Sequence, residues 1–403
     1  MDHQLVSAIE KALGWSGPDS LGREFARGAL TDDGLRARLL TPTRLLDLVM
    51  RRSLAPHRLQ CLMDGNFLHP QHYISMSTAR RGDAVPMADM NRLGQLLKSG
   101  CTVVVDEVNT YDPTMEVACR ALQWWSRELV QVNTYLTTGQ AAGFNLHWDD
   151  HDVVIVQLAG EKSWDVRGLT RPAPMFRDAV ANPEPSDEVV WAGTMKPGDI
   201  MHIPRGYWHQ ATRKDGGDGY SMHVTFGFTK RVGVNWLTWL ADEARQHELF
   251  RHDLDRWGPN TTQAEQQANL SEAVSTLAEH HTFSDFLTAR ERQQPPARHI
   301  ATHGIFGPPE TVVCISDFPP LIETADGVVT VKAARKAIDF AAQALPALQL
   351  LLSGRPVNVA DVGAATGVNA AKLAEVLVAE DMCADVTPEL ASGYTGLVSS
   401  EVQ

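Results

Sequence analysis

The sequence has 403 residues, 43% of them hydrophobic and 21% charged, which is enough for two to three domains that each bury a core. Its 36 Lys and Arg against 49 Asp and Glu give a formal net charge of −13, which repels nucleic-acid phosphates and argues against a nucleic-acid-binding protein. No run of about 18 apolar residues predicts a transmembrane helix, and the first residues carry neither the basic nor the apolar part of a secretory signal.

Residues 1–95 are expected to form a mostly helical region that packs on the rest of the protein. Apolar residues crowd positions 45–50 and predict one short helix. Leu93, Leu96 and Leu97 lie at i, i+3 and i+4, and therefore share one face of a second helix.

From residue 96 to residue 234 the pattern changes to short strands. A β-branched run over 101–105 predicts a buried strand, and residues 115–129 predict a helix. Four more strands with turn signals between them are predicted at 153–156, 163–166, 199–203 and 221–226. Short strands at this spacing are typical of a jelly-roll sandwich or barrel.

The last part of the chain is predicted to be helical over 235–292 and mixed over 297–386. An apolar face follows i, i+3, i+4, i+7 spacing in the first of these segments: Leu270, Ala273, Val274 and Leu277. The Gln-Gln-Pro-Pro sequence over 293–296 predicts a linker. Strands are predicted at 311–315 and 327–331, helices at 359–364 and 369–378 that resemble a helix-turn-helix, and a frayed tail over 387–403.

Five cysteines, an odd number without a Cys-x-x-Cys pair, predict buried reduced thiols in a cytoplasmic protein instead of a disulfide framework or a zinc site. They are Cys61, Cys101, Cys119, Cys314 and Cys383.

The segment 143–149 contains the first two candidate metal ligands. If this segment is a strand, alternation puts His147 and Asp149 on one face. A third ligand must come from a distant strand, and His209 follows a Pro-Gly turn, a strand and a second Pro-x-Gly turn about 60 residues later. Two histidines and one carboxylate that leave the other positions open are the ligand set of non-haem Fe(II) oxygenases.

Neighbouring residues are rivals for these roles. Asp150, His151 and Asp152 lie beside the pair, but Asp150 has the opposite parity and should face away from the metal. His202 and His223 lie within predicted strands and are expected to be core or pocket histidines.

Four motifs in this region resemble the JmjC-type 2-oxoglutarate oxygenases, and most closely their ribosomal-oxygenase (cupin-4) subgroup. They lie at 132–137 (VNTYLT), 143–150 (GFNLHWDD), 156–164 (VQLAGEKSW) and 198–211 (GDIMHIPRGYWHQA). The resemblance implies an α+β protein with a double-stranded β-helix core of the jelly-roll or cupin kind, together with flanking helices.

The resemblance also implies the site residues and the cofactors Fe(II), 2-oxoglutarate and O2. Three residues are implied as catalytic metal ligands: His147, Asp149 and His209. Four residues are implied as the 2-oxoglutarate pocket: Lys162, Asn133, Tyr135 and Thr225. The cation of Lys162 would hold the far carboxylate, because a dianion bound inside a barrel needs a buried counter-ion.

Beyond the catalytic domain, the resemblance implies a helical dimerisation region over 235–292 and a winged-helix-like domain over 297–386. DNA binding is not expected of the latter, because Lys372 is the one cation of its second helix and stands against Glu375, Glu380 and Asp381. A methyltransferase loop at 359–367 is excluded, because too few residues follow it to complete a Rossmann domain. The expected partners are therefore a second copy and a substrate, without membrane or nucleic acid.

The leading hypothesis is an Fe(II)/2-oxoglutarate-dependent hydroxylase of a peptidyl side chain, on a ribosomal protein or a ribosomally made peptide. Two alternatives stay open. One is a hydroxylase of a free amino acid or small natural product. The other, of a different class, is an inactive cupin that acts as a binding scaffold, although an intact ligand triad with Lys162 argues against it.

Overall fold

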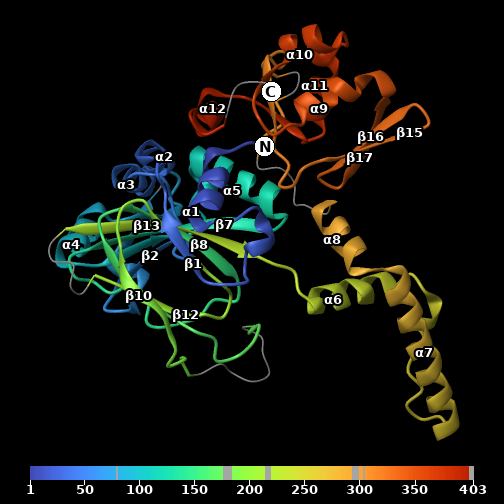
Figure 1. Ribbon diagram of the computed structural model, residues 1–403, viewed down its shortest axis with the longest axis horizontal. Helices are drawn as coiled ribbons and strands as arrows, with labels where there is room; N and C mark the ends of the chain where they lie inside the picture. Colours follow the sequence, from blue (N-terminus) through green and yellow to red (C-terminus); the bar gives the residue numbers. More distant parts are fainter. Residues whose placement is uncertain (79, 176–183, 214–218, 293–298, 303–304, 399–403) are drawn as a thin grey trace.

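The first 230 residues are built around a sandwich of two antiparallel sheets. The computed structural model describes residues 1–78, 80–175, 184–213, 219–292, 299–302 and 305–398. The larger sheet has the order β1-β11-β8-β13-β7-β6-β2-β3 and the smaller one β10-β9-β12 (Figure 1). The strands of this region beyond residue 100 are β6 (Thr102–Val105), β7 (Leu129–Thr138), β8 (Asp152–Ala159), β9 (Lys162–Arg167), β10 (Val189–Met195), β11 (Asp199–Ile203), β12 (Trp208–Thr212) and β13 (Tyr220–Thr229).

The alternation of side chains along β8 separates two hydrophobic layers. Val153 and Ile155 face the smaller sheet, where they pack with Trp164 of β9. Val154 and Val156 face the opposite way, into the core beneath the helices. Because both faces are covered, β8 is an almost continuous apolar run. The predicted jelly-roll sandwich is confirmed.

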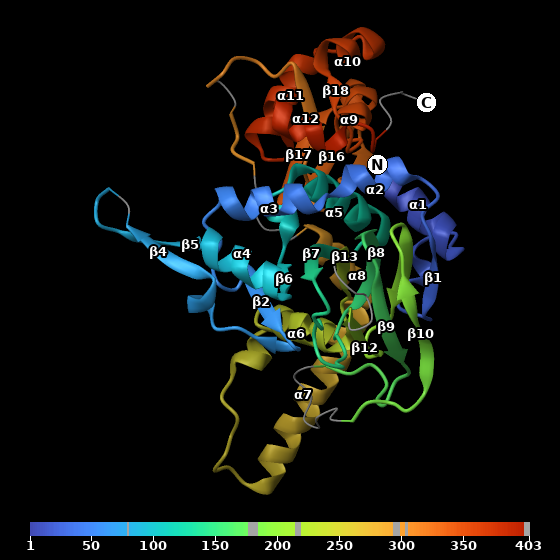
Figure 2. The same ribbon diagram turned by 90° about the vertical axis from the view of Figure 1, so that its left-hand side faces the viewer.

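Helices cover the outer face of the larger sheet (Figure 2). They are α1 (Gln4–Leu13), α2 (Asp33–Leu39), α3 (Pro42–Arg51), α4 (Met90–Ser99) and α5 (Pro113–Ser126). Helices α3, α4 and α5 confirm the three helices expected near 45–50, 93–97 and 115–129. Helix α5 ends at Ser126, because Arg127 adopts the left-handed conformation.

The expectation that residues 1–95 are mostly helical is wrong. This part also contains β1 (Ala26–Ala29), β2 (Leu59–Met63), β3 (Asn66–Phe67), β4 (Ile74–Thr78) and β5 (Ala84–Ala88). Strands β1, β2 and β3 extend the larger sheet, and β4 pairs with β5 as a hairpin. Strand β1 has the sequence Ala-Arg-Gly-Ala and forms the edge of the larger sheet because it pairs with β11, so that tertiary pairing overrides local propensity.

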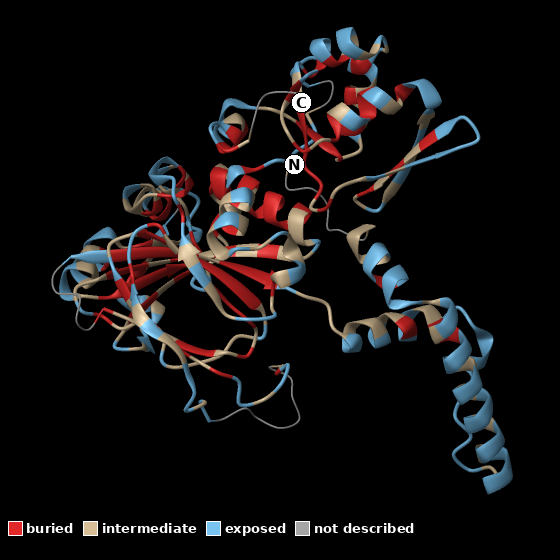
Figure 3. Ribbon diagram, in the orientation of Figure 1, coloured by how far each residue is buried: buried red, intermediate tan, exposed pale blue. Residues whose placement is uncertain are grey.

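A helical arm leaves the sandwich after β13 (Figure 1). It consists of α6 (Gly233–Ala244), α7 (Asn260–His280) and α8 (Phe283–Arg292). Its small core contains Leu240, Ala244 and Leu277. Of the predicted apolar face on α7, Leu277 is buried whereas Val274 is 49% exposed, and Figure 3 shows most of α7 open to solvent.

The C-terminal part has its own core beside two small sheets, β18-β14-β19 and β15-β16-β17. The predicted strands and the helix-turn-helix shape are confirmed, and Gly367 makes the turn in the left-handed conformation. The predicted linker over 293–296 lies outside the described residues. The elements are β14 (Thr311–Cys314), β15 (Leu321–Ala325), β16 (Val328–Ala333), β17 (Lys336–Ala341), α9 (Leu345–Leu351), β18 (Val357–Asn358), α10 (Val359–Thr366), α11 (Ala370–Ala379), β19 (Cys383–Asp385) and α12 (Pro388–Tyr394).

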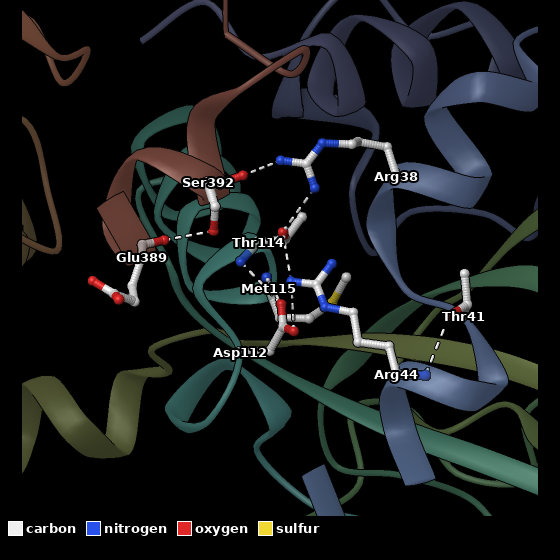
Figure 4. Close-up of polar contacts among 8 residues, drawn as sticks. All are labelled: Arg38, Thr41, Arg44, Asp112, Thr114, Met115, Glu389 and Ser392. Atoms are coloured by element: carbon white, nitrogen blue, oxygen red, sulfur yellow. Dashed lines mark hydrogen bonds and ion pairs between the residues drawn. The ribbon is translucent and has the colours of Figure 1, made fainter. Parts of the chain in front are cut away.

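Helix α5 joins this C-terminal part to the sandwich. Trp124 donates from Nε1 to the carbonyl of Ser316 at 2.9 Å and packs in the C-terminal core. On the other side of α5, Arg38 reaches the carbonyl of Ser392 in α12 (Figure 4). The expectation of a frayed tail from Thr387 is therefore wrong for residues 387–398, whose helix α12 buries apolar side chains against α5.

All five cysteines are buried and free, as the sequence predicts. In the described part of the chain, no helix has the length and apolar character that crossing a bilayer requires.

Candidate metal centre

A cavity of about 300 Å³ lies between the two sheets and contains all three candidate metal ligands. His147 and Asp149 come from the segment between β7 and β8, and His209 comes from β12. Their ligand atoms all lie within 4.8 Å of one another, and this is the one such group of His, Cys, Asp or Glu among the described residues.

Backbone pairing brings the two histidines together. His147 and His209 are antiparallel bridge partners, with N–H···O distances of 3.1 and 2.7 Å between their main chains. Partners that stand directly opposite each other point their side chains to the same face. The segment 147–149 is not a regular strand as expected, because this single bridge holds it, but the extended backbone still places His147 beside Asp149 in the cavity.

Each imidazole is oriented by a backbone carbonyl. His147 Nδ1 donates to the carbonyl of Asn145 at 2.7 Å, and His209 Nδ1 donates to the carbonyl of Tyr207 at 3.1 Å. A carbonyl accepts only, so both rings carry their proton on Nδ1 and leave Nε2 for a metal. His209 Nε2 lies 3.5 Å from Asp149 Oδ2. This donor set fits a divalent iron that retains open positions.

The three candidate ligands shift the pKa values of one another. Although burial opposes it, the hydrogen bond with His209 holds the pKa of Asp149 below its usual range. Burial works against the charged form of His209 as well, but the Asp149 carboxylate raises the pKa of this imidazole. Burial and the neighbouring His209 lower the pKa of His147. The carboxylate is thus ionised and His147 neutral, the forms that bind a metal, whereas His209 would give up its Nε2 proton when a metal binds.

The rival ligands are used elsewhere. Asp152 forms an ion pair with Lys230 at 3.1 Å and accepts a hydrogen bond from the backbone of Arg205. Asp150 contacts His151 at 3.4 Å. His151 lines the cavity but does not belong to the three-residue group.

Lys162 enters the same cavity from β9 and is only 1% exposed. Its Nζ donates to Thr137 Oγ1 at 2.5 Å, and no described carboxylate forms an ion pair with it. Burial, with a contribution from Arg213, lowers the pKa of Lys162 to about 7. A fully buried amine without a counter-ion is costly, and an anionic ligand in the cavity would remove that cost.

Strand β7 provides one wall of the cavity. Asn133, Tyr135 and Thr137 share the face that looks toward Lys162, as alternation along a strand requires. Thr225 of β13 is the register partner of Asn133 and also lines the cavity. The backbone N–H of Glu107 donates to Asn133 Oδ1 at 3.0 Å, which fixes that side chain.

Two buried polar atoms of the cavity wall have no hydrogen-bond partner among the described residues: His223 Nδ1 and Trp164 Nε1. The His223 ring stacks on Tyr135 with a centroid distance of 4.7 Å, and burial keeps its pKa well below the usual value. Orphaned polar atoms next to Lys162 fit a cavity that receives a polar ligand. His202, by contrast, is satisfied on both nitrogens by the backbone of Gly22 and Glu24.

The remaining cavity wall is aromatic and acidic. Phe67 is 59% exposed and lies 5.4 Å from Phe144, measured between ring centroids. Asp106 accepts a hydrogen bond from Gln60 at 2.7 Å, and burial raises its pKa to about 6. Apart from Phe144, which lies in the 143–150 motif, the sequence alone did not indicate these residues, because they come from β2, β3 and the loop after β6, which meet only in the folded chain.

The region that contains this site is similar to known proteins. Residues 110–235 match the JmjC domain family. The Caenorhabditis elegans protein described as bifunctional lysine-specific demethylase and histidyl-hydroxylase NO66 is 32% identical over 183 residues, which is 42% of this chain and 24% of that protein. The Dictyostelium discoideum protein of the same description is 34% identical over 131 residues, 32% of this chain and 25% of that protein. The chain thus spans no more than a quarter of these two relatives.

Solved structures extend the likeness to almost the whole chain. The ribosomal oxygenase YcfD of Escherichia coli has a TM-score of 0.55 at 16% identity, over 95% of this chain and 99% of that one. The same protein in complex with cobalt and 2-oxoglutarate has a TM-score of 0.53 at 16% identity, over 93% and 99%. At this identity the likeness establishes the fold. The chain therefore carries a JmjC domain, set within the fold of the ribosomal oxygenases.

Proposed function

We propose that this protein is an Fe(II)- and 2-oxoglutarate-dependent hydroxylase of a peptidyl side chain. One observation carries the proposal: the triad of His147, Asp149 and His209 shares a single cavity with Lys162, a buried amine that has no carboxylate partner among the described residues. The triad would hold Fe(II), and Lys162 would hold the far carboxylate of 2-oxoglutarate. The titles of the similar proteins, a histidyl-hydroxylase and a ribosomal oxygenase, support the same activity.

When bound, Fe(II) and 2-oxoglutarate reduce O2, with release of succinate and CO2, and insert one oxygen atom into a C–H bond. The chain contributes position and shielding. The carbonyls of Asn145 and Tyr207 keep both Nε2 atoms directed at the metal position. Thr137 steadies Lys162, and the wall of β7 and β13 keeps water from the cosubstrate.

The cavity wall favours a substrate with a positively charged side chain. Asp106 is held partly neutral by burial, and a cation beside it would restore its charge. The faces of Phe67 and Phe144 near the exposed end add cation–π attraction. An Asp106→Asn variant is therefore expected to raise the KM for a cationic peptide about tenfold and to leave the KM for 2-oxoglutarate unchanged.

Mass spectrometry of ribosomal proteins and peptides, incubated with the Fe(II)-loaded chain, 2-oxoglutarate and O2, tests the function. We expect a gain of about 16 Da, one oxygen atom, on a peptide together with succinate formation. The same gain on free amino acids alone would favour the small-molecule alternative. Failure to bind iron or to consume 2-oxoglutarate would favour the other alternative, an inactive cupin that acts as a binding scaffold.

We further infer that the arm of α6, α7 and α8 mediates a homodimer. Its outer surface exposes apolar side chains such as Leu237, 57% exposed. The arm also contains a groove of about 540 Å³, which is lined by Leu249, Phe250 and Leu277. A second copy of the same arm offers matching apolar surface, and closed two-fold pairing is the commonest assembly.

The C-terminal part is proposed to act as a winged-helix-like unit in packing or substrate docking. In the helix-turn-helix of α10 and α11, Lys372 stands against Glu375 and Glu380, so phosphate contacts are not expected. A cytoplasmic location is proposed from the five free thiols.

A further inference from the structure

Two of the five cysteines stand directly opposite each other in the C-terminal part. Cys314 ends β14 and Cys383 begins β19, and the two are register partners in an antiparallel ladder. The neighbouring N–H of Ile315 donates to the carbonyl of Met382 at 3.0 Å, which places the cysteines at a non-hydrogen-bonded pair. At such pairs the Cα atoms are roughly 4.5 Å apart, the closest approach that a sheet offers.

Both sulfurs point into one core. Cys314 and Cys383 pack with Val312 in the C-terminal core, whereas the intervening pair, Val313 and Ala384, packs on the opposite face of the sheet. Both cysteines are at most 2% exposed. Disulfides join Cα atoms that are about 4.4 to 6.8 Å apart with side chains that converge, and this pair meets both conditions.

The surroundings of Cys314 stabilise a thiolate. Its Sγ lies 3.2 Å from Ser316 Oγ. The guanidinium of Arg120, which is 5% exposed, adds a positive charge from α5. Burial opposes ionisation, but the contacts with Cys383 and with Ser316, including its backbone N–H, together with the charge of Arg120 hold the pKa of Cys314 below its usual value. Cys383 Sγ also lies 3.7 Å from the carbonyl of Leu351, to which it can donate.

We propose that Cys314 and Cys383 are an oxidative modification site, at which hydrogen peroxide forms a reversible intramolecular disulfide. The Cys314 thiolate attacks one peroxide oxygen, the O–O bond breaks, and the departing hydroxide takes a proton to leave as water. The resulting sulfenic acid is attacked by the Cys383 sulfur, the S–S bond forms, and a second water leaves. Two thiols lose two electrons, and one peroxide is reduced to two waters.

The other three cysteines lie in different surroundings. Cys61 is the register partner of Val103, so it does not stand opposite Cys101. Burial raises the pKa of Cys101 to about 11 and that of Cys61 further above its usual range. Cys119 lies in α5. A thiol that stays protonated reacts poorly with peroxide, so Cys61 and Cys101 are expected to remain reduced. Cys119 is buried within the sandwich side of the core and is likewise expected to remain reduced.

The test treats the full chain with hydrogen peroxide in buffer that contains a metal chelator, so that bound iron takes no part. Thiols are then counted after denaturation, and peptides are mapped by mass spectrometry. We expect the count to fall from five to three, a cross-link between the peptides that contain Cys314 and Cys383, and full recovery with dithiothreitol. Five thiols remaining under conditions that oxidise free glutathione, or a cross-link between any other pair, would overturn the proposal.

Variants separate the roles of the two sulfurs. In Cys383→Ser, the sulfenic acid of Cys314 persists and is trapped by dimedone, whereas in Cys314→Ser no cysteine is labelled. The matched control is Cys119→Ser, in which two of four thiols are still lost. Dimedone labelling of Cys383 in preference to Cys314 would contradict the assigned order of attack. If a variant fails to fold, the peptide map of the unaltered chain still decides the pairing.

Discussion

Each histidine of the proposed metal centre donates a hydrogen bond to a backbone carbonyl, whereas Asp149 is the single carboxylate among the three proposed ligands. An Asp149→Ala variant keeps the imidazoles in place and removes the anionic ligand. We expect 2-oxoglutarate turnover to fall by at least about 100-fold and Fe(II) to bind more weakly, with an unchanged far-UV circular dichroism spectrum.

The adjacent carboxylate provides the control for this variant. Asp150 contacts His151 and does not belong to the ligand group. The Asp150→Ala variant should therefore retain turnover within about twofold. Equal losses in the two variants would contradict the ligand assignment.

Lys162 links cosubstrate binding to pH. Burial and Arg213 lower the pKa of its amine to about 7, so above pH 7 the free protein holds it largely neutral. Binding of a dianion favours the charged form and therefore takes up a proton there. We expect the Kd of 2-oxoglutarate to be nearly constant below pH 7 and to rise up to about tenfold per pH unit above it, measured by calorimetry at pH 6 and pH 8.5.

A Lys162→Met variant isolates this contribution from that of the metal ligands. Its Kd for 2-oxoglutarate should be higher at every pH, and the proton uptake at pH 8.5 should disappear. An identical pH profile in the two proteins would show that Lys162 does not pair with the cosubstrate.

At the site, the sequence predicts residues that lie in local motifs. His147, Asp149 and Lys162 could be named because a short motif specifies each of them. Asp106 and His223 could not be assigned a role in this way. Their exposure to the cavity depends on which distant strands pair, and one sequence does not specify that pairing.

Among the elements, α5 depends on an unusual N-terminal cap. Asp112 is 2% exposed, accepts hydrogen bonds from the backbone of Thr114 and Met115, and pairs with Arg44 at 2.7 Å (Figure 4). An Asp112→Ala variant loses the cap and leaves Arg44 without its carboxylate partner. We expect the free energy of unfolding to fall by about 2–4 kcal/mol, measured by urea denaturation.

A second capping aspartate serves as the matched control. Asp32 accepts from the backbone N–H of Gly34 at the start of α2, and this site is exposed. Its replacement by alanine should cost about 1 kcal/mol or less. A loss at Asp112 that is no larger than the loss at Asp32 would mean that the pair with Arg44 contributes little.

The elements that the sequence mispredicts are those that depend on a remote partner. Strand β1 has no apolar alternation of its own and forms only because it pairs with β11. Helix α12 lies in a polar tail, and its few apolar residues, Leu390 and Tyr394, become a buried face only because α5 lies beneath them. Strands β8 and β13, which carry their own apolar pattern, are predicted correctly.

At the scale of the whole molecule, the arm is the part with the least burial of its own (Figure 3). If it mediates a homodimer, the mass that light scattering measures at micromolar concentration should be twice the 44.3 kDa mass of the chain. A Leu237→Glu variant places a charge on the arm and should shift this mass toward that of the monomer.

An exposed apolar residue elsewhere provides the comparison. Leu321 of β15 is 39% exposed and lies outside the arm. A Leu321→Glu variant should keep the dimer mass. A monomeric mass for the unaltered protein would contradict the role of the arm.

Helix α5 contributes to three separate cores at once. Leu122 packs under the helical cover of the sandwich, Trp124 in the C-terminal core, and Val117 against α12. A fragment cut after α8 would expose Val117 and Trp124 to water, and the guanidinium of Arg120 would lose its hydrogen bond to Tyr394. The sandwich is therefore not a detachable module, and tests of the proposed activity require the intact polypeptide.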